Sequence, residues 1–127
     1  GLWWSLGAHF TNIYHATAAA DQEGRLAVLD ELVAGTKDLG SDEAFTNWLD
    51  TFDLMKDHSI DNASISDTDY DQGVENLATG KVGFWFMGNW AEPSLLTASP
   101  KSNFGIIPLP ISDDGASTRC ITWDARE

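Results

Sequence analysis

The segment TGKVGFWFMGNWAEP, residues 79–93, constrains the fold more than any other part of the chain. Over residues 82–87 it carries a run of β-branched and aromatic residues, which is typical of a short buried strand. A Gly-Asn pair then interrupts the run, and Pro93 is compatible with the first turn of a helix. The segment therefore predicts a strand, a tight turn and a short helix, in that order.

Several other segments place apolar side chains at helical spacing. The clearest helix covers about residues 42–57, where Ser41 or Asp42 is a suitable N-cap. A second helix, over 25–35, can end at Gly35. Its expected apolar face consists of Leu26, Leu29, Leu32 and Val33. The remaining predicted elements are a helix within 2–20, a turn at DQEG (21–24), a loop over 57–68, a helix from Asp67 or Thr68 to Gly80, and a second strand at 103–110. The predicted fold class is α/β, rich in helices and with few strands.

Charge and cysteine content exclude several classes of protein. The net charge is −13, from 20 acidic and 7 basic residues, so the chain repels phosphate backbones and anionic lipid heads. Cys120 is the single cysteine, which excludes an internal disulfide framework. No apolar run approaches the roughly 18 residues that a membrane span requires. Because the sequence begins at Gly1 and ends without a helix stop, we expect it to be a piece of a larger protein.

Metal and catalytic motifs do not match the sequence. DTDYDQG alternates acids as a calcium loop does, but the required glycine and glutamate are replaced by Gln72 and Ala78. The three histidines, His9, His15 and His58, lack the spacing of a zinc site and are interpreted as ordinary polar residues. Cys120 has no nearby histidine, and no serine lies in a nucleophile elbow. A pair of glycosidase carboxylates is not excluded by the number of acids alone.

Trp90 is the aromatic residue whose position calls for an explanation. Trp48 and Trp85 fall within a predicted helical stripe and a predicted strand, so both are interpreted as core. Trp90 instead follows the Gly-Asn break, where ligand sites of α/β proteins gather. Its flat face could stack on a sugar ring while Asn89 bonds to hydroxyls, or it could cover the edge of a sheet. Spacing alone leaves these two interpretations open.

The stretch LATGKVGFWFMGNWAEPSLL, followed by SNFGIIPLP, resembles the extracellular solute-binding proteins of family 1. That family includes maltose-binding protein and the sugar-binding subunits of many ABC importers. The matching residues are Gly80, Lys81, Met87, Gly88, Trp90, Phe104, Gly105, Pro108, Leu109 and Pro110. The resemblance covers roughly residues 2–112 and is specific over 67–110, whereas residues 113–127 match the pattern poorly.

The resemblance implies a fold and a site. The chain 1–127 would be a helix-rich, partial C-terminal lobe of a two-lobe, periplasmic-binding-protein-like (type II) fold that closes around a solute. Trp90 would stack on the sugar, with Asn89 and Gly88 beside it. Trp3 and Trp4, at the start of the first helix, resemble a segment that lines the cleft.

The resemblance also implies a role. It is that of a monomeric, non-catalytic subunit that binds an oligosaccharide, with no cofactor and no metal, and delivers it to the transmembrane subunits of an ABC permease. Its place would be the extracellular face of the bacterial envelope, either periplasmic or lipid-anchored. Two alternatives remain: a glycan-processing enzyme or its accessory domain, and a helical interaction module without a ligand. Full burial of Trp90 would favour the module.

Overall fold

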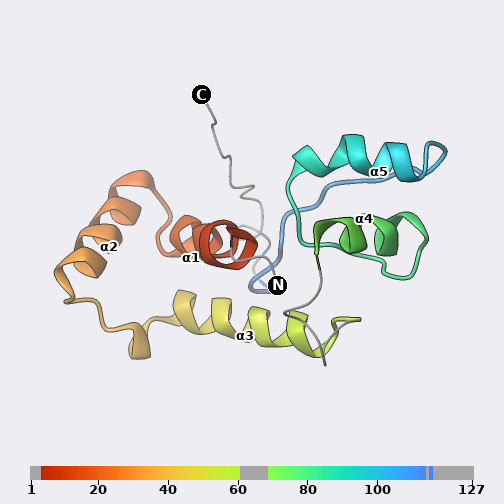
Figure 1. The fold of residues 1–127 in the computed structure, drawn as a ribbon. Coiled ribbons are helices and arrows are strands. Elements are labelled where there is room, and N and C mark those ends of the chain that lie inside the picture. Colours follow the sequence, from red (N-terminus) through yellow and green to blue (C-terminus); the bar gives the residue numbers. More distant parts are fainter. Residues whose placement is uncertain (1–3, 61–68, 114, 116–127) are drawn as a thin grey trace.

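The computed structural model describes residues 4–60, 69–113 and 115 of the chain. Within these residues the fold is helical and contains no strand (Figure 1). The elements in chain order are η1 (Ser5–Phe10), α1 (Thr11–Thr17), α2 (Gln22–Ala34), η2 (Leu39–Ser41), α3 (Glu43–Asp57), α4 (Tyr70–Ala78), η4 (Asn89–Ala91) and α5 (Glu92–Ala98). None of the described helices is both long and apolar enough to cross a membrane.

The first helical segment begins as a π-helix. The prediction of a helix within 2–20 is confirmed from Trp4 onward, but η1 is wound as a π-helix and only α1 is an α-helix. A π-helix closes its hydrogen bonds over five residues instead of four. Residues five apart therefore become neighbours along η1, a register that the α-helical periodicity of the sequence does not reveal.

Helix α2 ends as predicted, but it begins earlier than residue 25 and buries a different side chain from those predicted. Gly35 takes the left-handed conformation with φ of 68°, which favours glycine, and ends the helix. The predicted turn at 21–24 is wrong because the Asp21 carboxylate accepts a hydrogen bond from the Gly24 amide and caps the helix. The predicted apolar face is not the buried face of α2: its buried residue is Val28, Leu32 is half-buried, and Val33 is 83% exposed. Leu26 and Leu29 are exposed as well.

Helix α3 confirms the clearest sequence prediction. The Asp42 carboxylate caps it by accepting a hydrogen bond from the Phe45 amide at 3.2 Å. Helix α4 is also found, but its cap is Asp69 instead of Asp67 or Thr68. Residues 61–68, which include both predicted caps, lie outside the described residues. The short helix with Pro93 in its first turn is confirmed as α5.

The prediction of strands at 82–87 and 103–110 is wrong for the described chain, where neither segment pairs as a strand. A strand requires a neighbour with which to share a ladder of hydrogen bonds, and helices pack on both sides of 82–87 instead. The segment nevertheless keeps the side-chain alternation of a strand. Trp85 and Met87 pack on one side of it and Phe86 on the other.

Two hydrophobic cores lie on either side of this extended segment. The α1–α3 core is centred on Phe10, Ile13 and Ile111, with side chains of α3 and Phe86 packed around them. The α4–α5 core is centred on Val74, Ala91 and Leu95, with Trp85, Met87 and Phe104 packed around them. In Figure 1, α4 and α5 lie side by side, and α1, α2 and α3 form a separate group. Trp90 lies just after this extended segment, in η4, which leads directly into α5.

Candidate functional site

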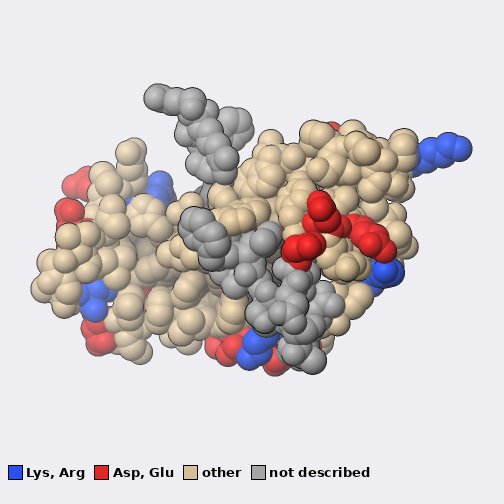
Figure 2. All heavy atoms as spheres, in the orientation of Figure 1, with Lys and Arg blue, Asp and Glu red and all other residues tan. Residues whose placement is uncertain are grey.

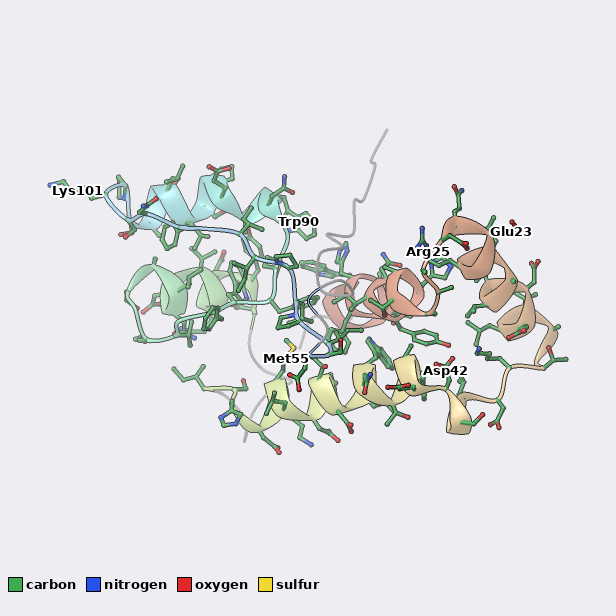
Figure 3. The ribbon with its side chains drawn as sticks, turned by 180° about the vertical axis from the view of Figure 1, so that it is seen from behind. Glu23, Arg25, Asp42, Met55, Trp90 and Lys101 are labelled. Carbon is green, nitrogen blue, oxygen red and sulfur yellow. The ribbon has the colours of Figure 1, made fainter. Side chains whose placement is uncertain are left out.

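Three aromatic side chains gather at the junction of the two helical groups. The ring centroid of His9 lies 4.9 Å from that of Trp90, with the rings tilted by 41°. Trp4 meets His9 edge to face at 5.6 Å, and its centroid lies 6.4 Å from that of Trp90. We call these three residues the aromatic cluster. Figure 3 shows Trp90 at the start of α5, on the side that faces α1.

The π-helix explains why Trp4 and His9 touch. In an α-helix the neighbouring side chains are three or four residues apart, whereas Trp4 and His9 are separated by five positions. The hydrogen-bonding register of η1 joins residues five apart and brings these two rings to one side of the helix. The register thus assembles one half of the aromatic cluster, and Trp90 supplies the other half.

Gly88 supports the ring of Trp90 from below. A Cβ atom built on Gly88 would overlap atoms of the Trp90 six-membered ring, so any larger residue would displace the indole. The backbone of Gly88 has φ of −85°, a conformation open to every residue. Glycine is needed here because of this close approach and not because of backbone strain. Its small size lets the indole approach the main chain closely.

Trp90 is partly open to solvent. Its exposed fraction is 39%. Full burial of Trp90 would have favoured a helical interaction module without a ligand, and this observation does not provide that support. The described residues also contain no sheet whose edge the ring could cover. By contrast Trp85 is half-buried: it packs against the α4–α5 core and against Tyr70, at a centroid distance of 5.4 Å. Two tryptophans five residues apart thus have different surroundings.

The structure brings together some of the site residues predicted from the sequence. Trp4, Gly88 and Trp90 are in contact, and Asn89 lies exposed at the first position of η4. Trp3 lies outside the described residues. His9 is the residue that sequence reasoning missed, because it was tested only as a metal ligand. The sequence feature that could have revealed His9 is its spacing of five residues from Trp4. That spacing places two side chains on one side of a π-helix but not of an α-helix.

A shallow groove of about 520 Å³ lies elsewhere, between α4 and α5. Its lining does not include any member of the aromatic cluster. Several of its hydroxyl groups already have partners: Thr97 donates to the Pro93 carbonyl, Thr79 donates to the Glu75 carbonyl, and Ser94 accepts from Tyr70. Acidic side chains gather over α4 on this face of the molecule (Figure 2). The groove therefore offers few uncommitted hydroxyls with which to orient a ligand, and we place the candidate site at the aromatic cluster.

The clearest changes in pKa lie in a structural network away from the cluster. The Tyr14 hydroxyl donates to the Asp42 carboxylate at 2.9 Å, and the Lys37 ammonium lies 3.1 Å from the same oxygen. Burial, together with this hydrogen bond, raises the pKa of Tyr14 to about 12. Burial would raise the pKa of Asp42, but the hydrogen bonds from Tyr14 and Lys37 outweigh it and lower that pKa. The network joins α1, α3 and the loop before η2, so its role is structural.

Metal coordination is not suggested by the described residues, where no group of three or more His, Cys, Asp or Glu side chains could hold an ion. Comparison with protein families instead matches residues 1–125 to the model of the bacterial extracellular solute-binding proteins. The chain belongs to that family. Comparisons with curated proteins and with solved structures returned no match.

Membership of the solute-binding protein family confirms the resemblance on which the sequence analysis relied. It implies binding of a solute outside the cytoplasmic membrane and interaction with the permease of an ABC transporter. Members of this family are generally non-catalytic.

Proposed function

We propose that this solute-binding protein binds a carbohydrate, an oligosaccharide or a related sugar, and delivers it to an ABC importer. Trp90 is the stacking platform of the proposed site, and Asn89 supplies hydrogen bonds beside it. The observation that carries the proposal is the indole of Trp90, which lies on Gly88 and is 39% exposed. A large apolar ring held in place at the surface suits the C–H face of a sugar.

The chemistry of the cluster favours a neutral ligand over an anionic one. Neither Trp4 nor Trp90 carries a charge, and the chain has a net charge of −13. An anionic solute would be repelled by that field and would find no Lys or Arg within the cluster. A sugar needs instead a flat apolar surface and a few donors and acceptors, which indole rings and the Asn89 amide provide.

We also propose that the chain is part of the C-terminal lobe of a two-lobe α/β protein. Support comes from the extended segments 82–87 and 103–110, which retain exposed apolar side chains such as Phe84, Ile106 and Ile107. Extended, apolar segments with unpaired edges are suited to pairing with further strands. A second lobe would then supply the opposite side of the sugar cleft.

The test is calorimetry on the intact protein with a panel of maltotriose, cellotriose, xylotriose and raffinose, followed by variants titrated with the best-bound sugar. Trp90→Ala should weaken binding about fivefold or more, since stacking of a ring on an aromatic side chain, as measured for nucleobases, contributes on the order of 1–3 kcal/mol. Leu96→Ala is the matched control, because Leu96 is similarly exposed on the adjoining helix α5. Unchanged affinity of Trp90→Ala, or no binding of any sugar, would show that the assignment is wrong.

A further inference from the structure

A stacking ring holds a sugar but does not orient its hydroxyl groups. Small-molecule sites therefore combine apolar walls with a few placed polar groups. In the proposed site Asn89 is one such group, and it lies on the chain directly before Trp90. A second polar group on another element would fix the position of the sugar across the face of Trp90. His9, on η1, is the polar side chain whose ring lies beside that of Trp90, at a centroid distance of 4.9 Å.

The ring distances decide where a ligand could lie. The three centroids of the aromatic cluster are 4.9, 5.6 and 6.4 Å apart, which are the separations of rings in contact with one another. No space for a ligand remains between them, so the cluster is a packed wall and not a cage. A ligand must lie on the outer surface of this wall, where Trp90 is exposed.

The imidazole of His9 is half-buried and packs against Trp90. Its contacts among the described residues are with the two indole rings, and no hydrogen bond in that part of the chain occupies either of its nitrogens. The described residues also contain no buried side-chain nitrogen or oxygen that lacks a partner. The nitrogens of His9 are therefore not fully buried. Neutral imidazole offers one donor and one acceptor, the pair that a sugar hydroxyl can use.

We propose that His9 contacts the ligand in the same site and hydrogen-bonds to a hydroxyl at the edge of the sugar ring that stacks on Trp90. This inference rests on the proposed function, because it requires a sugar on Trp90. The site then holds its ligand from two elements. Asn89 acts from the start of η4, and His9, whose ring lies 4.9 Å from that of Trp90, acts from η1. The ligand class follows: a neutral sugar with more than one ring hydroxyl free to form hydrogen bonds.

Substitutions that separate ring packing from hydrogen bonding test the inference, again in the intact protein and with the best-bound sugar of the panel. His9→Phe keeps an aromatic ring against Trp90 but removes both nitrogens, and should weaken binding about three- to tenfold, the range of one hydrogen bond. Of His9→Gln and His9→Asn, the variant whose amide reaches the hydroxyl should restore affinity to within about threefold of the original. His58→Phe, at the exposed C-cap of α3, is the matched control and should bind normally.

The outcomes distinguish this inference from the proposed function. If Trp90→Ala weakens binding and His9→Phe does not, the site stands and the role of His9 is wrong. Tighter binding by His9→Phe would mean that the imidazole competes with the ligand, which also overturns the inference. Failure of both amide variants to recover any affinity overturns it as well. If Trp90→Ala itself has no effect, the proposed function fails first. Circular dichroism melts should confirm that each variant is folded.

Discussion

The two hydrophobic cores are built in different ways, although one extended segment contributes to both. In the α1–α3 core, rings that are distant in the sequence meet around Phe10, and the network around Asp42 joins the helices beside it. In the α4–α5 core, the neighbouring helices pack with Trp85, whose ring lies against Gly73. The first core depends on aromatic packing and on charge. The second depends on Gly73, which has no side chain and so leaves room for the Trp85 ring.

This difference bears on the candidate site, because the aromatic cluster joins the two groups. Trp4 and His9 belong to the segment that enters the α1–α3 core, whereas Trp90 belongs to the segment that enters the α4–α5 core. The geometry of the cluster therefore depends on both cores remaining folded. Loss of either should disturb binding indirectly, so stability must be measured alongside affinity.

The largest expected effect is on the α1–α3 core. Phe10 is 2% exposed and contacts Trp48, Phe52 and Phe86 at centroid distances of 5.3, 5.7 and 5.5 Å. Phe10→Ala should lower the free energy of unfolding by about 3–5 kcal/mol, because it leaves a cavity among these rings. Urea denaturation measures the change, with Leu29→Ala on the exposed side of α2 as control. A loss below about 1 kcal/mol would contradict the assignment of this core.

A smaller effect, dependent on pH, is expected from the network of the same core. Asp42→Asn should lower the free energy of unfolding by about 1.5 kcal/mol at neutral pH, because it removes a charge-assisted hydrogen bond from Tyr14. Asn remains a good N-cap for α3, so the loss in the free energy of unfolding reports the removal of the Asp42 charge and not the loss of the cap. Hydrogen exchange should show greater loss of protection in α3 than in α4. Equal loss of protection in α3 and α4 would mean that the two cores do not unfold separately.

The sign of the pH dependence follows from the two pKa shifts. The lowered pKa of Asp42 contributes stability that is present above about pH 4 and is lost as the pH falls through the folded-state value. The raised pKa of Tyr14 contributes stability that is present below about pH 10 and is lost as the pH rises toward 12. Asp42→Asn should reduce the loss of unfolding free energy at acid pH, as measured by urea denaturation at a series of pH values. An unchanged loss at acid pH would show that other carboxylates are responsible.

The smallest expected effect is at Gly73. A Cβ built there would lie 2.6 Å from atoms of the Trp85 ring, so Gly73→Ala must displace the indole. Overpacking of this kind costs about 1–3 kcal/mol, but alanine in place of glycine inside a helix recovers about 1 kcal/mol. We expect a net loss of about 1 kcal/mol and a shift in tryptophan fluorescence. Gly83→Ala, with nothing within 4 Å, is the control. Increased stability of Gly73→Ala would show that Trp85 has room to move.

Local rules explain which elements were predictable. The cap of α3 at Asp42 and the stops of α2 and α4 at Gly35 and Gly80, which both have positive φ, were predictable. These interactions span four residues or fewer, so the sequence contains both partners. The face of α2 was mispredicted because periodicity shows that residues share a face but not which face meets a partner.

By itself, the sequence determined the helices, the family and the position of Trp90 after a break in the chain. Only the tertiary structure decided that residues 82–87 lie between two helical groups without pairing as a strand, since pairing depends on which neighbours come close. It also decided that Trp90 lies on Gly88 and against His9. The contact with His9 joins residues far apart in the chain, and the π-helical register that brings Trp4 to His9 is not encoded in local periodicity.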